Sequence, residues 1–187
     1  DLELIMDGSF APLTGFLNED DYHNVLDNMK LCNGSVWPIP INLDVDDEFL
    51  KTINDDSSIT LRDKEGFAIA ILDIESKWKP DKENEVLKIY NTKNPEHPGV
   101  NYILNQTNDW YIGGQIKSIQ NPKHYDYNNL RLTPNDVKQK FIDMDWNRVV
   151  AFQTRNPMHR AHKEIMQRAA EEIGGNALLH PVVGMTK

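Results

Sequence analysis

Between residues 149 and 162 the sequence reads Val-Val-Ala-Phe-Gln-Thr-Arg-Asn-Pro-Met-His-Arg-Ala-His, and this stretch decides the fold of the C-terminal part. The run Val149–Phe152 is fully apolar, which is typical of a strand buried in a parallel sheet. A polar loop follows it. Asn156 is a favoured N-cap and Pro157 a favoured first helical residue, so we expect a helix to begin there.

A second strand completes this pattern. Apolar residues recur every three or four positions along the expected helix and predict one apolar stripe: Met158, Ala161, Ile165, Ala169 and Ile173. Gly174-Gly175 predicts a left-handed stop, and residues 177–183 are expected to form a strand. Strand, helix and strand in this order predict a βαβ unit. Another helix is expected upstream, with Thr133 as its N-cap and Pro134 at its first position.

The loop after the first strand carries the residues that indicate chemistry. In a βαβ unit this loop lies at the carboxyl end of the sheet, where open α/β proteins bind ligands, and the N-terminus of the next helix favours an anion. Arg155 adds a planar fork suited to an oxyanion, and Gln153 and Thr154 add neutral donors. His159 and His162 are three residues apart, so we expect both on one side of the helix, off the apolar stripe. These residues predict an oxyanion site, and a phosphate chain fits it best.

Each member of this set also has an ordinary structural interpretation. Asn156 can be only a cap, and a single helical histidine is more often a surface residue than a catalytic one. The His-x-x-His spacing is compatible with zinc, but zinc needs a third and usually a fourth ligand, and the lone Cys32 lies in another part of the chain. We therefore predict no metal ligands. The other histidines have no comparable setting and are interpreted as structural or surface residues: His23, His97, His124 and His180.

The N-terminal part shows short apolar segments between polar turns. A helix is expected over residues 18–29, where Tyr22, Val25, Leu26 and Met29 recur at helical spacing. The expected strands are 36–41, 58–62, 66–74, 86–90 and 110–119, the first of them an edge strand because two prolines cannot donate to a ladder. Gly113-Gly114 predicts a bulge or bend in the last strand. Strands at this spacing favour a small barrel or sandwich.

Charge is unevenly spread along the chain. The net charge is −9, but residues 131–187 hold nine Lys/Arg against six Asp/Glu, whereas residues 1–130 hold eleven against twenty-three. The acidic whole argues against nucleic acid as a partner, and the basic C-terminal third fits a small anionic ligand. No apolar run is long enough to span a membrane, and no membrane partner is expected. The single cysteine, Cys32, favours a reducing compartment.

Several segments together resemble one enzyme family. Residues 153–162, Gln-Thr-Arg-Asn-Pro-Met-His-Arg-Ala-His, closely resemble the signature of the sulfate adenylyltransferase (ATP sulfurylase) family. Residues 8–17, Gly-Ser-Phe-Ala-Pro-Leu-Thr-Gly-Phe-Leu, resemble its N-terminal G-x-F-x-P-L-x-G-F segment. Residues 96–100, 111–114, 132–134 and 180–187 also resemble family segments in the same order. The resemblance therefore covers nearly the whole chain.

The resemblance implies a fold and a reaction. The fold is α/β plus β: a PUA-like β-barrel domain over residues 1–130, then over 131–187 the first βαβ unit of a Rossmann-like nucleotidyltransferase domain. The reaction makes adenosine 5′-phosphosulfate and pyrophosphate from ATP and sulfate, with Mg²⁺ carried by the ATP. A sulfate oxygen attacks the α-phosphorus directly, in line with the departing pyrophosphate. As in other nucleotidyl transfers, positioning and charge stabilisation would do most of the catalysis. For the full-length protein the resemblance implies a homo-oligomer and a cytoplasmic location.

The resemblance also assigns roles to the loop residues. Gln153 and Arg155 would contact sulfate, and the residues from Gln153 to Asn156 would lie against the ATP phosphates. Thr154, Arg155 and Asn156 would be catalytic. His159 and His162 would bind ATP and stabilise the transition state and pyrophosphate.

The chain also departs from the family pattern. The second family signature, G-R-D-H-A, does not occur in these residues, and a single βαβ crossover leaves apolar faces uncovered. We therefore expect a truncated catalytic domain that is inactive alone. Two other interpretations stay open. Another nucleotidyltransferase would share the His-x-x-His logic but leave the N-terminal segments unexplained, and a PUA-like module that binds RNA would conflict with the acidic charge of residues 1–130.

Overall fold

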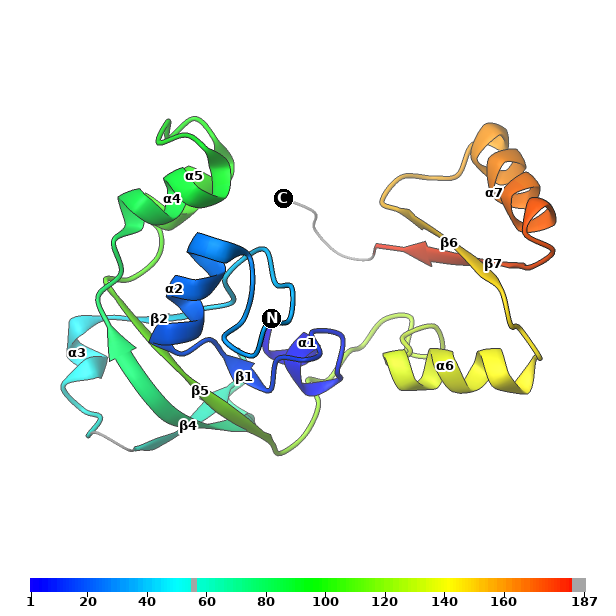
Figure 1. Ribbon diagram of the computed structural model, residues 1–187. Helices are drawn as coiled ribbons and strands as arrows, with labels where there is room; N and C mark the ends of the chain where they lie inside the picture. Colours follow the sequence, from blue (N-terminus) through cyan, green and yellow to red (C-terminus); the bar gives the residue numbers. More distant parts are fainter. Residues whose placement is uncertain (55–56, 183–187) are drawn as a thin grey trace. The chain divides into compact units, whose positions relative to one another are not determined.

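The computed structural model describes residues 1–54 and 57–182, in two compact units, Asp1–Asn128 and Asn129–Lys187. Each unit has its own sheet (Figure 1). The end of the predicted second strand, at Val183, and the family-like segment up to Lys187 lie outside the described residues. No helix among the described residues is both long enough and apolar enough to cross a membrane.

The first unit is built on an antiparallel sheet around one long strand. β5 (Trp110–Ser118) pairs along one edge with β4 (Ala68–Trp78), and β4 pairs in turn with β3 (Ser58–Arg62). The other edge of β5 is shared by two short strands. β2 (Leu43–Val45) pairs with residues 110–112, and β1 (Gly15–Phe16) pairs with residues 114–115. The expected strands 58–62 and 110–119 are confirmed, and 66–74 lies largely within β4.

The two central glycines of β5 allow other backbone segments to approach it closely. A Cβ atom on Gly113 would lie 1.8 Å from the carbonyl oxygen of Leu17, and one on Gly114 would lie 2.0 Å from that of Asp73. The predicted irregularity is present, but the extra residue belongs to the neighbouring strand. Ile74 pairs with Gly114 and Ser76 with Gly113, which leaves Glu75 as the bulged residue of β4.

The pairings among the described residues form an open path, β1-β5-β4-β3, with β2 on β5. The first unit therefore combines an antiparallel sheet with helices, and the small barrel or sandwich predicted from the strand spacing is seen among the described residues only as this open sheet.

Helices cover this sheet, and all of those described except α1 begin at a side-chain cap. They are α1 (Leu2–Met6), α2 (Glu19–Asn28), α3 (Asp47–Leu50), α4 (Lys82–Tyr90) and α5 (Pro98–Asn105). The predicted helix 18–29 is confirmed as α2, because Asn18 accepts from the N–H of Asp21 and Met29 ends the helix in a left-handed conformation. α4 and α5 pack against each other through a small apolar cluster, Val86, Val100 and Ile103 (Figure 1).

Two strand predictions are wrong. Residues 86–90 lie in α4, where Asp81 caps the N-terminus and Asn91 stops the helix at a φ of 53°. A five-residue window rich in Val, Ile and Tyr resembled a strand, but the helix is decided by the caps that lie outside that window. Residues 36–41 form no strand beyond an isolated bridge from Val36 to Lys30. With two prolines the segment has too few donors for a ladder.

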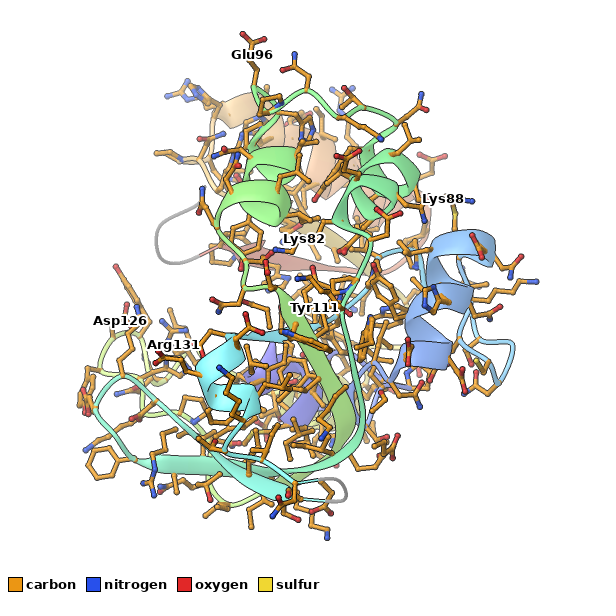
Figure 2. The ribbon with its side chains drawn as sticks, turned by 90° about the vertical axis from the view of Figure 1, so that its left-hand side faces the viewer. Lys82, Lys88, Glu96, Tyr111, Asp126 and Arg131 are labelled. Carbon is orange, nitrogen blue, oxygen red and sulfur yellow. The ribbon has the colours of Figure 1, made fainter. Side chains whose placement is uncertain are left out.

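One charged side chain is buried in the core of the first unit. Glu85 on α4 is 2 % exposed, and its Oε2 accepts hydrogen bonds from the phenols of Tyr22 (2.9 Å) and Tyr111 (3.1 Å). Tyr111 projects from β5 on the side of α4 (Figure 2). Burial raises the pKa of Glu85, while the two phenol hydrogen bonds act to lower it. The shared carboxylate ties α2, α4 and β5 together.

The second unit contains a parallel strand pair. α6 (Pro134–Asp143) has Thr133 as its N-cap and Pro134 as its first residue, as predicted. The side chains of Thr133 and Asp136 also form a capping box. β6 (Val149–Thr154), α7 (Arg160–Glu172) and β7 (Asn176–Pro181) form a βαβ arrangement, with β6 and β7 parallel and in register from Val149↔Asn176 to Thr154↔Pro181. The expected strand pair and the stop at Gly174, with a φ of 57°, are confirmed. α7 covers one face of the pair (Figure 1).

Candidate functional site

The candidate site begins where β6 ends. Gln153 and Thr154 are the last two residues of the strand, and Arg155 and Asn156 lie in the loop that leads to α7. The ladder with β7 continues to this point, because the N–H of Val182 donates to the carbonyl of Thr154 at 2.8 Å. The loop is therefore anchored at the carboxyl end of two parallel strands.

The threonine hydroxyl shapes the start of the loop. Thr154 Oγ1 accepts from the N–H of Asn156 at 3.1 Å and donates to the carbonyl of Asn156 at 2.9 Å. These bonds hold residues 154–156 in a tight turn. The side chain of Arg155, at the middle of the turn, is exposed.

The helix starts three residues later than predicted. α7 begins at Arg160 with His159 as its N-cap, so neither Asn156 as N-cap nor Pro157 as first helical residue is correct. The carbonyl of Asn156 accepts from the Thr154 hydroxyl in the turn, whereas an N-cap carbonyl would accept the first helical hydrogen bond. The consequence is a longer polar loop, 155–159, in front of the helix.

The two histidines are tied together at the first turn of α7. The backbone N–H of His159 donates to Nδ1 of His162 at 3.3 Å, and their rings meet edge to face with centroids 5.6 Å apart. Because Nδ1 accepts, a neutral His162 carries its proton on Nε2. The His162 ring also lies 5.6 Å from the ring of Phe152 on β6.

The face of α7 that packs on the sheet differs from the predicted stripe. Ala170 is buried, and the half-buried residues at helical spacing around it are His162, Met166, Ala169 and Ile173. Ile165 is 60 % exposed, and Met158 precedes the helix. His162 therefore lies on the sheet side, and only His159 is exposed. The two rings contact each other, as their spacing predicts, but the expectation that both imidazoles lie off the apolar face is wrong for His162.

Alternation along β6 divides the site between two faces. Phe152 faces α7, so Gln153 must face the opposite side of the strand pair. Thr154, Asn156, His159 and His162 gather near the helix end. The structure thus brings the six predicted residues together at one end of the sheet, with Gln153 on the far face.

The electrostatic setting of the loop is basic. Arg155, Arg160 and Lys163 have no ion-pair partner within the described part of the chain, and the first turn of α7 holds no acidic residue. Positive side chains and the helix N-terminus therefore act on one region, which favours an anion. Among the described residues no group of three or more His, Cys, Asp or Glu side chains is placed to hold a metal ion.

The register also brings in a residue that sequence interpretation had set aside. His180 on β7 pairs with Gln153 on β6. The pairing of two strands separated by a helix depends on their register, which the sequence does not reveal.

Two family models match different parts of the chain. Residues 1–121 match a family model described as a PUA-like domain, and residues 128–187 match the ATP-sulfurylase model. The chain is 49 % identical over 187 residues to the sulfate adenylyltransferase of Saccharomyces cerevisiae and 44 % identical over 189 to that of Schizosaccharomyces pombe. Each match spans the whole of this chain but only 36 % and 39 %, respectively, of those two relatives. The hexameric APS kinase from Thiobacillus denitrificans matches with a TM-score of 0.78 and 32 % identity, over 99 % of this chain and 32 % of that one.

The chain is therefore of the class of proteins in which a PUA-like unit is followed by part of an ATP-sulfurylase domain. The chain belongs to the sulfate adenylyltransferase family. It spans a little over a third of the length of the curated relatives it matches.

Proposed function

We propose that this chain supplies the first substrate loop of a sulfate adenylyltransferase, which converts ATP and sulfate to adenosine 5′-phosphosulfate and pyrophosphate. The observation that carries the proposal is the loop 155–159, which joins the parallel strand β6 to the N-terminus of α7. It bears Arg155, which has no ion-pair partner among the described residues, and His159, whose N–H donates to His162 in the first turn of α7. Helix N-termini at the carboxyl end of a parallel sheet are established anion sites.

The chemistry needs positioning more than proton transfer. A sulfate oxygen forms a bond to the α-phosphorus while the bond from that phosphorus to the pyrophosphate oxygen breaks, and the electron pair leaves with pyrophosphate. Negative charge grows on the phosphoryl and leaving oxygens. Donors held in place before the reaction lower the barrier most effectively.

Each loop residue has a proposed role in that scheme. Gln153 and Arg155 bind sulfate, and Arg155 does so through its fork. Thr154, Arg155 and Asn156 align the reacting groups. The Thr154 turn fixes the direction of the loop, which supports this assignment.

His159 and His162 are proposed to stabilise the transition state and the departing pyrophosphate. The Nδ1 atom of His162 is already occupied by the His159 N–H, so its Nε2–H is the donor left for a phosphate oxygen.

Mg²⁺ is proposed to arrive with ATP and to neutralise phosphate charge when bound. Among the described residues no group of three or more His, Cys, Asp or Glu side chains is placed to hold it.

The finer fold assignments remain proposals. We infer that residues 131–187 begin a Rossmann-like nucleotidyltransferase domain and that residues 1–130 form a PUA-like barrel. The parallel β6–α7–β7 unit supports the first, and the division of the chain near residue 128 supports the boundary. A homo-oligomeric state is also proposed, and the hexameric assembly named for the Thiobacillus denitrificans protein supports it. A cytoplasmic location is proposed from the family resemblance, and the single cysteine agrees with a reducing compartment.

Backbone amide mapping by NMR tests the proposed function. A non-hydrolysable ATP analogue with sulfate is expected to shift the amide signals of residues 153–162 and to leave β3 and β4 of the first unit unchanged. Shifts confined to the first unit, or no shifts at millimolar ligand, would contradict the proposal. If the ATP analogue alone shifts these signals and added sulfate causes no further change, a nucleotidyltransferase with another acceptor would be favoured.

A further inference from the structure

We propose that His180 is a further anion-binding residue, which donates to the same tetrahedral oxyanion as Gln153 on the sheet face opposite α7. The inference deepens the proposed function and rests on it. It concerns a residue that lies 27 positions away in the sequence from its proposed partner, on the other strand of the pair.

Register makes the two residues direct neighbours. β6 and β7 are parallel, and Gln153 pairs with His180 in an unbroken series that runs from Val149↔Asn176 to Thr154↔Pro181. Side chains of paired residues on adjacent strands point to the same face, with Cβ atoms about 5 Å apart. Both side chains are exposed. An amide and an imidazole at that spacing can donate to one oxyanion.

The face that carries them is the one that α7 leaves open. Phe152 contacts His162 on α7, and alternation places Gln153 and its partner on the other side. The residues of that face along the two strands are Val149, Ala151, Gln153, Asn176, Leu178 and His180. None of them is acidic. No carboxylate on these strands would therefore repel an anion or compete for the imidazole.

The pair also lies at the ligand-binding end of the sheet. Gln153 and His180 are the last residues on this face before the strands end at Thr154 and Pro181, and Arg155 follows in the loop. The apolar Ala151 and Leu178 lie one step behind them on the same face.

The test measures sulfate affinity of the 187-residue chain by calorimetry. His180→Ala is expected to weaken sulfate binding about tenfold or more, the loss typical of one hydrogen bond to a charged group. His180→Asn, which keeps a donor, is expected to recover part of the loss. His23→Ala, an exposed histidine of the first unit, is the matched control and should change nothing. Because His180 is exposed, His180→Ala is expected to melt at the wild-type temperature, and thermal melting checks this.

The ligand source is separated by two titrations, one with sodium sulfate alone and one with the ATP analogue alone. A loss for sulfate only assigns the shared oxyanion to sulfate, and a loss for the analogue only assigns it to a phosphate group of ATP; either loss supports the proposal, because Gln153 is proposed to meet both. Unchanged affinity in His180→Ala, with binding lost in Arg155→Ala, would overturn this inference and leave the proposed function standing. A wild-type chain that binds neither ligand would contradict the proposed function itself.

Discussion

The N–H of His159 donates to Nδ1 of His162 at 3.3 Å, and this contact links the cap of α7 to its sheet-facing side. The two imidazoles are therefore unequal. His159 is exposed, whereas His162 packs against Phe152 and its Nδ1 has an intramolecular partner. A histidine pair that looked symmetrical in sequence has one structural member and one free member.

Alanine substitutions should reveal this difference. His162→Ala removes a hydrogen-bond acceptor and a ring contact, so it is expected to cost about 1 kcal/mol of folding free energy. His159→Ala keeps its backbone N–H and should cost less than about 0.5 kcal/mol. Urea denaturation of the two variants is the measurement. Both are expected to weaken binding of the ATP analogue, and equal stability losses would show that the observed packing of His162 contributes nothing.

Arg155→Lys is expected to lose most sulfate affinity although the charge is kept, because an ammonium group cannot reproduce the fork of the guanidinium. Arg168→Lys on the outer side of α7 provides the matched control, since Arg168 pairs with Glu164 and lies 75 % exposed. Sulfate titration of both variants decides the matter. Sulfate binding by Arg155→Lys at the wild-type affinity would refute the bidentate contact.

Glu85 predicts a pH dependence of stability in the first unit. Its folded-state pKa is raised above the usual value by burial, so protonation stabilises the fold. The contribution is fully present below the unfolded-state pKa of about 4.5 and is lost as the pH rises through the folded-state pKa. Glu85→Gln keeps an acceptor for the two phenols and cannot ionise. Its free energy of unfolding should gain on the wild type as pH increases from 4 to 8.

The control for that series is Glu83→Gln, an exposed residue of the same helix. Its curve should follow the wild type closely over this pH range. If Glu85→Gln and the wild type show the same slope, the carboxylate is not perturbed by its buried position.

Gly113→Ala should destabilise the first unit by about 3 kcal/mol or more, because its new Cβ would lie 1.8 Å from the Leu17 carbonyl oxygen and the backbone must move. Gly66→Ala is the comparison. Gly66 has a φ of 91° but nothing within 4 Å, so only backbone strain of about 1 kcal/mol is expected. Thermal melts of the two variants test the difference, and similar melting temperatures would show that β5 accommodates the methyl group.

Local sequence signals predicted elements whose determinants are themselves local. The helix ends at three places are set by residues next to them in the sequence: Asn18 caps α2, Thr133 and Pro134 begin α6, and Gly174 follows α7 with a positive φ. The same reasoning failed at 86–90, where a β-rich window is overruled by caps at Asp81 and Asn91. It also placed the start of α7 too early, because the Thr154 hydroxyl engages Asn156 in a turn that competes with capping.

The candidate site divides along a similar line. The residues between Gln153 and His162 are contiguous, so one motif indicated them all. Their arrangement could not be predicted from the sequence. The contact between Phe152 and His162 shows which side of α7 meets the sheet, and therefore on which face of β6 Gln153 lies. His180 was missed because its pairing with Gln153 depends on the register of two strands that are separated by a helix.

The central claim is that the loop from Gln153 to His162 is an oxyanion site. Calorimetric titration of the wild-type chain with an ATP analogue plus sulfate, beside Arg155→Ala and the Arg168→Ala control, tests it most directly. We predict saturable binding by the wild type and by Arg168→Ala, and its loss in Arg155→Ala. Equal binding by all three chains would contradict the claim, since the anion would then be held without the guanidinium of Arg155.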